Sequence, residues 1–380
     1  MKTLTLPTIN FVPVRKTNQR TVVFKFGEFF CGPGGLASGA ISSQCKRNGC
    51  LYKIEHVWSN DYDNDSCRTY QRNICSDNPN SVICEDIRQL NIEKLSSVDA
   101  FAYGFPCNDF SIVGKQKGFK GEYGPLYLYG VKLLNYFKPK FFLAENVGGI
   151  ASANEGKAFE KINSDLENAG QGYEITAHLY KSEEYGVPQT RHRIILIGID
   201  KRFNFRFKVP APITALNPKT VRATLEKPPI SKNAFNNEYT KQSDKVIERL
   251  KYIQPGENVW TANLPNHLKL NVKGAKLSQI YRRLHPDKPA YTITGSGGGG
   301  THGYHWKEPR ALTNRERARI QSFPDDFIFE GSKESVRKQI GMAVPPLLSE
   351  IIFTAVLKTF AGITYPCVEP NLKNKRISFD

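Results

Sequence analysis

The sequence predicts an α/β fold built on a mostly parallel sheet, followed by a second, smaller domain. Between Thr21 and Gly198, short apolar runs alternate with helix-length amphipathic segments, an order typical of a parallel sheet with helices on both faces. After Lys201 the sequence becomes rich in Pro and Asn, and neither the strand period nor the helix period is sustained. We therefore expect four segments: an N-terminal arm (1–20), an α/β domain (21–200), a second domain (201–310), and a segment whose apolar helix packs back on the first domain (311–380).

Composition and charge indicate a globular protein with a polyanionic partner. The 380 residues include 53 Lys and Arg against 36 Asp and Glu, a formal net charge of +17, and 39% are hydrophobic. Residues 201–310 hold 20 basic and 7 acidic residues, so +13 of this excess lies in the expected second domain. No apolar run reaches the roughly 20 residues that span a bilayer, and the N-terminus lacks the apolar block of a signal peptide. We expect a cytoplasmic protein that binds a polyanion and no membrane.

The cysteines do not predict a metal site. The chain has eight, without a C-x-x-C pair or a Cys/His spacing typical of zinc. In a reducing cytosol the ordinary interpretation of each is a small buried apolar residue. Only Cys107 departs from it, because its sequence context places it in a loop.

The first three expected strands end in residues suited to a nucleotide-type cofactor. The first, VVFKFGEFF, runs into the turn Cys31-Gly-Pro-Gly-Gly35, whose glycines permit close approach of the backbone to a ligand. The strand KIEHVWS is followed by Asp61, and SVIC is followed by Asp86. Because parallel strands end at the same edge of a sheet, these residues predict an adenosine-type site. They do not distinguish NAD from another adenosine cofactor.

The following strands bring reactive groups to the same edge. DAFAYG ends shortly before Cys107, and a preceding proline restricts that loop, so a thiolate there would be a nucleophile at the crevice. KFFLAE delivers Glu145, a carboxyl group that shares the crevice with the thiol. In QTRHRIILIGI, Arg191 and Arg193 lie on the same side at period two. Near an anionic substrate this pair would bind a phosphate or a base carbonyl.

Taken together, these motifs resemble the DNA cytosine-5 methyltransferase family from about Val23 to Leu348. The resemblance rests on segments that occur in the family's order, namely FFCGPGG, NDYD, EDI, GFPCNDFS, ENV, QTRHR, RALTNRERARIQSFPDDF and QIGMAVPP. It implies a Rossmann-like large domain that uses S-adenosyl-L-methionine, a smaller target-recognition domain, and double-stranded DNA in the cleft between them. It also implies methyl transfer to carbon 5 of a cytosine in a specific short duplex sequence, by base flipping and a covalent Cys107 intermediate.

The resemblance assigns roles to individual residues. Cys107 is expected to add to carbon 6 of cytosine, Glu145 to contact ring nitrogen 3 and the amino group, and Arg193 with Arg191 to support the flipped base and its phosphate. Cofactor contacts are expected from Phe30, Gly32, Gly34, Gly35, Asp61, Tyr62, Asp86, Ile87 and Pro106. DNA contacts are expected from Ser111, Gln189, Arg282, Arg283 and His302.

Two positions depart from the family pattern. Glu28 stands where Asp is usual, which leaves a carboxylate near the amino acid end of the cofactor. Met342 stands where Asn is frequent, which removes a polar side chain near the methionine moiety and puts cofactor affinity in question. Nearby, Thr313 and Glu316 predict a capping-box start for a helix that Pro324 ends.

Three alternatives stay open at this point. An RNA (tRNA) cytosine-5 methyltransferase of the same fold would carry similar motifs, but the basic second domain favours DNA. A non-catalytic DNA-binding relative is disfavoured by the intact Cys107 and Glu145. A nicotinamide-dependent oxidoreductase would leave both residues unexplained. We expect a monomer, associated with the nucleoid, with a cognate restriction endonuclease as a separate protein or with none.

Overall fold

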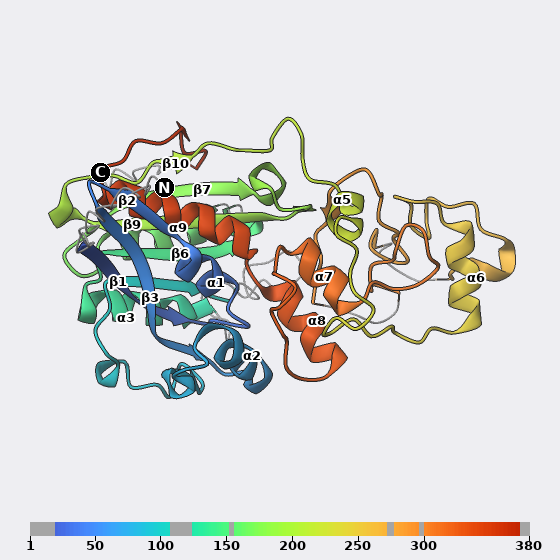
Figure 1. The fold of residues 1–380 in the computed structure, drawn as a ribbon, viewed down its shortest axis with the longest axis horizontal. Helices are drawn as coiled ribbons and strands as arrows, with labels where there is room; N and C mark the ends of the chain where they lie inside the picture. Colours follow the sequence, from blue (N-terminus) through green and yellow to red (C-terminus); the bar gives the residue numbers. More distant parts are fainter. Residues whose placement is uncertain (1–19, 107–123, 152–155, 272–276, 296–299, 373–380) are drawn as a thin grey trace, which may run out of the picture.

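The computed structural model describes residues 20–106, 124–151, 156–271, 277–295 and 300–372. Their main feature is an eight-stranded sheet with the order β2-β3-β1-β5-β6-β9-β7, in which β4 also pairs with β3 (Figure 1). The strands are β1 (Arg20–Phe29), β2 (Gln44–Arg47), β3 (Cys50–Asp61), β4 (Val82–Cys84), β5 (Ala100–Gly104), β6 (Phe141–Val147), β7 (Tyr173–Lys181) and β9 (His192–Asp200).

The sheet is mostly parallel, as the sequence predicts. The pairs β3–β4, β1–β3, β1–β5 and β5–β6 are parallel, whereas β9 runs antiparallel between β6 and β7. Each expected strand is present. The sequence analysis did not identify β2 or β7, and β2 is a short antiparallel strand at the edge of the sheet.

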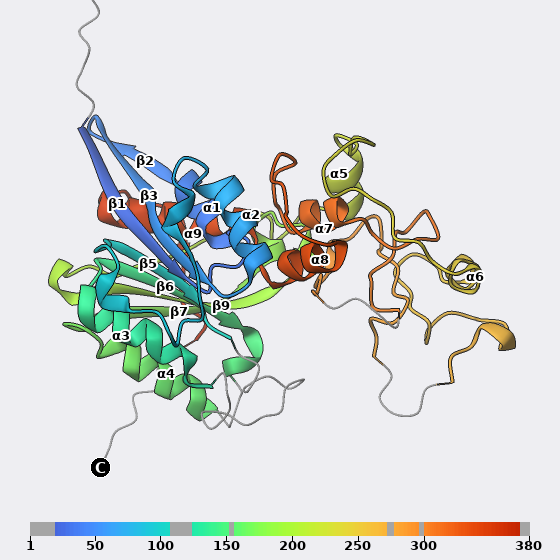
Figure 2. The same cartoon turned by 90° about the horizontal axis from the view of Figure 1, so that it is seen from below.

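Helices cover both faces of this sheet, as Figure 2 shows. On one face lie α1 (Gly35–Ser42), α2 (Asn64–Ile74) and α9 (Pro346–Phe360), and on the other lie α3 (Tyr127–Phe137) and α4 (Lys157–Glu167). Each face has its own apolar cluster, one shared with α1 and α9 and one shared with α3 and α4. Covering both faces buries the central strands completely, which accounts for their near-continuous apolar sequences.

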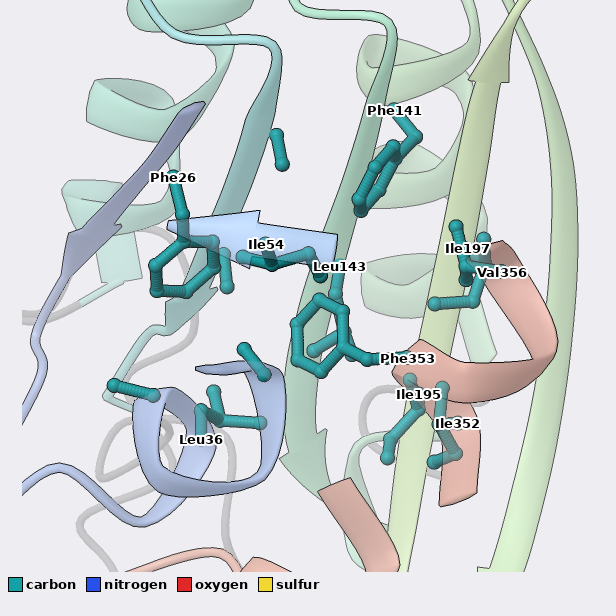
Figure 3. Packing of buried hydrophobic residues seen from close by; sticks show 14 of the residues in the cluster. Phe26, Leu36, Ile54, Phe141, Leu143, Ile195, Ile197, Ile352, Phe353 and Val356 are labelled. Carbon is teal, nitrogen blue, oxygen red and sulfur yellow. The ribbon is translucent and has the colours of Figure 1, made fainter. Parts of the chain in front are cut away.

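The core beneath α9 is built from aromatic and branched side chains (Figure 3). The Phe353 ring lies 5.8 Å from that of Phe26 and 6.3 Å from that of Phe141, measured between centroids. Burying a side chain of this size contributes about 1.5–3 kcal/mol. The stretch Lys333–Phe360 contains a window apolar enough to cross a membrane, but 72% of that window is buried inside the protein, as in a core helix.

A smaller lobe, residues 219–342, lies beside the carboxyl ends of the parallel strands (Figure 1). Its helices are α5 (Val221–Glu226), α6 (Asp244–Tyr252), α7 (Asn314–Ile320) and α8 (Lys333–Met342). Three small apolar clusters form its interior. The predicted capping box is present, because Thr313 accepts from the Glu316 amide while the Glu316 carboxylate accepts from the Thr313 amide.

The chain between the lobes does not follow the expected boundaries residue for residue. Phe207 and Val209 belong to the core of the large lobe, and β10 (Val209–Pro210) pairs with β12 (Cys367–Val368). Conversely, α7 and α8 lie with the smaller lobe, while α9 packs on the sheet. The segment 311–342 therefore supplies the base of the smaller lobe.

Candidate active site

The candidate site lies where the parallel strands end. Strand β1 is flanked by β3 on one side and β5 on the other, so the chain connections leave it in opposite directions and open a crevice at its carboxyl end. Ligands of open α/β sheets bind in such crevices. The residues that follow β1, β3, β4, β5 and β6 are the ones that the sequence analysis singled out.

The turn after β1 depends on left-handed backbone conformations. Gly32 and Gly34 have φ values of 52° and 95°, which favour glycine, and Phe30 itself adopts φ 53°. A side chain on Gly32 would meet no atom within 4 Å, so open space lies in front of this turn. Gly35 by contrast packs closely, because a Cβ there would lie 2.3 Å from the Val344 carbonyl oxygen. Gly32 thus leaves room for a ligand, whereas Gly34 packs against Ile74 and Tyr70 and Gly35 packs against the segment that leads into α9.

Asp61 ties the end of β3 to this turn. Its carboxylate accepts hydrogen bonds from the amides of Gly32 at 2.8 Å and of Asp63 at 2.9 Å. Burial raises the pKa of Asp61, and these two amide hydrogen bonds oppose that shift. The next residue, Tyr62, is 66% exposed.

Asp86 provides a second carboxylate at the end of β4. It pairs with Arg88 at 2.5 Å, and this hydrogen bond holds the pKa of Asp86 below its usual value. The exposed ring of Tyr62 lies in the chain between the carboxylates of Asp61 and Asp86 and near the open turn at Gly32. This set of groups fits the base and ribose of an adenosine cofactor. The side chain of Ile87 lies in the apolar core, so only its backbone faces this region.

The two departures from the family pattern lie in different surroundings. Glu28 is fully buried and accepts a hydrogen bond from the Tyr70 hydroxyl at 3.1 Å, and its burial raises its pKa well above the usual value. Its side chain therefore belongs to the interior of the protein, and its nearness to the amino acid end of the cofactor stays a prediction. Met342 is 63% exposed at the end of α8.

Glu145 and Arg193 form an ion pair at the end of β6. The Arg193 Nε atom lies 2.8 Å from Glu145 Oε1, with only 13% and 12% of the two side chains exposed. Burial raises the pKa of Glu145, although Arg193 and Arg191 oppose the shift. Antiparallel pairing of β6 with β9 brings them together, since Val147 is opposite Arg193.

The segment that carries Cys107 leaves the sheet next to this pair. Gly104, the last residue of β5, is in register with Glu145, and a Cβ on Gly104 would lie 3.1 Å from Glu145 Oε2. The side-chain amide of Asn146 donates to the Phe105 carbonyl at 3.0 Å and so fixes the residues that follow β5. Pro106 is the last described residue before the gap, and Cys107 and Ser111 lie outside the described residues.

The sequence analysis missed two buried asparagines that hold this edge together. Asn146 anchors the loop after β5, and Asn60 donates to the carbonyls of Ile83 and Glu85 at 2.9 and 2.8 Å, joining the ends of β3 and β4. Both asparagines could have been identified from the sequence, because each stands at the end of an apolar strand. A buried polar side chain at such a position needs a hydrogen-bond partner.

Three residues expected at the substrate or the DNA lie in the interior instead. Arg191 is 1% exposed and donates to the carbonyls of Ile293 and Gly341 at 3.1 and 2.9 Å. Gln189 is fully buried, and the guanidinium of Arg283 donates to four backbone carbonyls. Because these side chains are buried and bond to groups inside the protein, we correct the expected contacts and assign the three side chains structural positions.

The other two expected DNA residues described by the structure are more accessible. Arg282 is partly exposed, and its guanidinium lies 4.4 Å from the centre of the Tyr291 ring. His302 is half-buried, and burial together with the charges of Arg337 and Arg317 lowers its pKa. The imidazole is therefore neutral near pH 7, which leaves it able to make a polar contact but not an ion pair.

The fold and the site define a class of protein. A mostly parallel sheet in which β9 is reversed between β6 and β7, with a glycine turn and two carboxylates at the strand ends, is the fold of S-adenosylmethionine-dependent methyltransferases. The family model "C-5 cytosine-specific DNA methylase" matches residues 24–358. The chain belongs to this family and is a DNA (cytosine-5-)-methyltransferase, as the motifs predict.

Individual relatives agree with this assignment. The chain is 57% identical over 352 residues to the type II methyltransferase M.BbvI of Brevibacillus brevis, covering 91% of this chain and 94% of that protein. It is 43% identical to the type II methyltransferase M.NgoFVII of Neisseria gonorrhoeae, over 85% of this chain and 83% of that protein. The solved structure of the Entamoeba histolytica methyltransferase EhMeth is similar with a TM-score of 0.61 and 17% identity over 89% of this chain and 98% of that one, which establishes the fold alone.

Proposed function

We propose that this enzyme transfers a methyl group from S-adenosyl-L-methionine to carbon 5 of a cytosine within a specific short sequence of double-stranded DNA. The observation that carries the proposal is the buried Glu145–Arg193 pair, beside the point where the segment bearing Cys107 leaves β5. The target cytosine has to leave the duplex to reach this buried carboxyl group, because its ring edge is enclosed in the base stack.

Glu145 is suited to donate a hydrogen bond to a cytosine. Burial raises the pKa of Glu145 and so favours its protonated form, which is the form that donates a hydrogen bond to ring nitrogen 3. Arg193 binds Oε1, and the absence of a side chain at Gly104 leaves Oε2 open toward the loop. The carboxyl group is thereby oriented before the substrate arrives, and no reorganisation is needed during the reaction.

The proposed chemistry begins with the Cys107 thiolate. A carbon–sulfur bond forms at carbon 6, and the displaced electron pair makes carbon 5 nucleophilic while Glu145 donates to nitrogen 3. S-adenosyl-L-methionine, when bound, would supply the electrophilic methyl group that carbon 5 takes up, with the electron pair of the broken methyl–sulfur bond staying on its sulfur. Water then takes the proton from carbon 5, the electron pair of that bond restores the double bond between carbons 5 and 6, and the carbon–sulfur bond to Cys107 breaks to release the thiolate.

The cofactor would be held by the residues at the ends of β1, β3 and β4. The glycine turn leaves open space at Gly32 for the methionine part, Asp61 is placed for the ribose hydroxyls, and the exposed ring of Tyr62 is placed to stack on adenine. Asp86 is partly exposed and able to accept from the adenine amino group.

We further propose duplex DNA as the substrate partner and a cognate restriction endonuclease as a separate protein. Relatives at 57% and 43% identity are type II methyltransferases, and +13 of the net charge lies in residues 201–310. Phosphate contacts of this basic segment would offset the cost of flipping the base. The protein would act as a monomer in the bacterial cytoplasm, at the nucleoid.

A covalent trap tests this proposal. The full-length protein and its Cys107→Ser variant are incubated with S-adenosylmethionine and a pool of duplexes, and methylated cytosines are mapped by sequencing. A duplex carrying 5-fluorocytosine at the mapped position should then trap the protein through Cys107, because fluorine does not leave as the proton does. The serine variant should bind the duplex without forming the adduct.

Two outcomes would overturn the proposal. Label appearing in tRNA but not in duplex DNA would favour the RNA methyltransferase alternative. Turnover on cytosine without any adduct on 5-fluorocytosine would exclude the covalent route through Cys107.

A further inference from the structure

The short strand β8 (Gln189–Thr190) connects the active-site strand β9 to the smaller lobe. It pairs in parallel with β11 (Ala290–Tyr291), and the Thr190 hydroxyl donates to the Ala290 carbonyl at 3.0 Å. Gln189 is fully buried, and its Oε1 accepts from the Ile293 amide at 2.9 Å. This two-residue strand therefore fixes the segment Ala290–Gly295, which directly precedes the glycine run of the smaller lobe.

A second glutamine extends this connection to the end of α8. The Gln189 Nε2 atom donates to Gln321 Oε1 at 2.5 Å. The Gln321 Nε2 atom donates in turn to the Ala343 carbonyl at 2.5 Å. Both side chains are fully buried. We call Gln189 and Gln321 the glutamine clamp. Loss of either side chain would leave buried polar groups without partners, which costs about 1–3 kcal/mol for each group.

The backbone of Ala290–Gly295 is held from the opposite side as well. A Cβ on Gly341 of α8 would lie 2.0 Å from the amide nitrogen of Gly295, so the helix and the segment are in direct backbone contact. Arg191 joins the same two elements through the carbonyls of Ile293 and Gly341. The segment is thus enclosed between α8 and the residues that lead into β9.

The lobes do not pack continuously around this connection. A cavity of about 500 Å³ opens between α1, α9 and the smaller lobe, and its lining includes Pro188 and Ser322, the chain neighbours of the two clamp residues. The glutamine clamp therefore lies beside this cavity. It acts together with a second connection between the lobes, in which α2 is joined to α8 through Thr69 and Gln339.

From this geometry we infer that Gln189 and Gln321 are positioning residues that fix Ala290–Gly295 of the smaller lobe relative to Glu145 and Arg193. Gln189 is four residues from Arg193 along the chain, and β9 pairs with the strand that carries Glu145. The inference rests on the proposed function, because it assigns the smaller lobe to the bound duplex. The clamp then sets the distance between the part of the protein that holds the target sequence and the part that reacts with the flipped base.

Single-turnover methylation of the cognate duplex tests the clamp. Gln189→Met and Gln321→Met keep the length of the side chain and remove its hydrogen bonds. With cofactor and duplex saturating, each should lower the rate of methyl transfer by about 10-fold to 100-fold, since small misplacements cost that much. The dissociation constant for S-adenosylmethionine should stay within about twofold, because the cofactor residues are untouched. The double variant should be no slower than the slower single one, as expected for residues that act together.

Gln339 provides a matched control. It is also a buried glutamine, 3% exposed, and it joins α8 to α2 of the large lobe by accepting from Thr69, while it donates to the Glu330 carbonyl. Neither of these bonds involves Ala290–Gly295 or β8. Gln339→Met should lower the thermal midpoint as much as the clamp variants do. Its methyl-transfer rate at saturation should fall less than about threefold, which separates positioning from general loss of stability.

Each outcome bears on one proposal. A wild-type protein that methylates no duplex overturns the proposed function, and the clamp with it. An active wild type with clamp variants as fast as Gln339→Met overturns the clamp alone. Should the methionine variants fail to fold, Thr190→Val removes one bond to Ala290 from an exposed side chain. It should slow methyl transfer several-fold at an unchanged thermal midpoint, and a wild-type rate there would also overturn the inference.

Discussion

The two lobes satisfy their buried polar groups in different ways. In the large lobe, backbone groups pair within an eight-stranded sheet, and the buried guanidinium of Arg193 is paired with a carboxylate. In the smaller lobe the described residues form few strands, and buried arginines donate to backbone carbonyls instead. Arg283 contacts four such carbonyls, and Arg315 contacts those of Phe235, Pro324 and Phe327.

This difference teaches how to interpret a buried arginine. An arginine whose hydrogen bonds go to backbone carbonyls replaces missing secondary structure. An arginine paired with a buried carboxyl group affects the protonation of that group, and it indicates a reactive site where the pair lies at the ends of the parallel strands, as Glu145 and Arg193 do. The basic excess of the smaller lobe is consequently of two kinds, interior arginines that hold its irregular chain and exposed residues that face a polyanion.

The largest expected effect comes from breaking the reactive pair of the large lobe. Glu145→Gln keeps the shape of the side chain but removes the acidic proton that can be donated to ring nitrogen 3. We expect single-turnover methyl transfer to fall by about 10²-fold to 10⁴-fold, the usual contribution of general acid catalysis. The thermal midpoint should change little, because the amide oxygen of the glutamine can still accept a hydrogen bond from Arg193.

The pH dependence of the wild type provides the control for this experiment. Because burial raises the pKa of Glu145, its protonated form persists to higher pH than that of an exposed glutamate. The contribution of this proton is fully present below the raised pKa and is lost as the pH rises through it. The rate of the glutamine variant should lack that descending limb, and an identical limb in both proteins would contradict the assignment.

The next largest effect comes from removing a carbonyl-bonded arginine of the smaller lobe. Arg283→Met removes hydrogen bonds to four buried carbonyls, of which that of Leu250 keeps a second donor in the Ile253 amide, and we expect the free energy of unfolding to fall by about 3 kcal/mol. Urea denaturation followed by tryptophan fluorescence measures the change. The neighbouring Arg282→Met should cost less than about 1 kcal/mol, the usual worth of a partly exposed cation–π contact. Equal losses for both variants would remove the distinction between the two kinds of arginine.

The sequence was sufficient to predict most strands of the large lobe, all but β2 and β7, and the residues at their ends. Apolar runs such as FFLAE are visible without a structure, and the parallel order of the sheet brings their ends to one edge. The pairing of Glu145 with Arg193 was not predictable in the same way. It depends on the antiparallel register of β6 and β9, which the two separate segments do not specify.

In the smaller lobe the sequence predicted the charge but not its arrangement. Arg282 and Arg283 are adjacent and chemically identical, yet one is partly exposed over Tyr291 and the other is buried. No strand or helix period covers this segment, so nothing in the sequence indicates which side chain points inward. Gln189 was misplaced for the same reason, because its partners come from residues more than 100 positions away.

The smallest expected effect concerns the arginine that stays accessible. The guanidinium of Arg282 is held 4.4 Å from the centre of the Tyr291 ring, and the Tyr291 hydroxyl donates to the Arg282 carbonyl at 3.0 Å. The charge of Arg282 is thus held against Tyr291 of β11, the strand that pairs with β8, and it is available to a DNA phosphate.

If Arg282 contacts one phosphate, Arg282→Met should lower the slope of log affinity against log salt by about one, with equal weakening for all duplex sequences. Titrations of a fluorescent duplex at several salt concentrations measure this slope. The methyl-transfer rate at saturating duplex should stay unchanged, since Glu145 and Arg193 keep their positions. Unchanged slopes would mean that Arg282, like Arg283, serves the fold of the smaller lobe and that the phosphate contacts lie elsewhere.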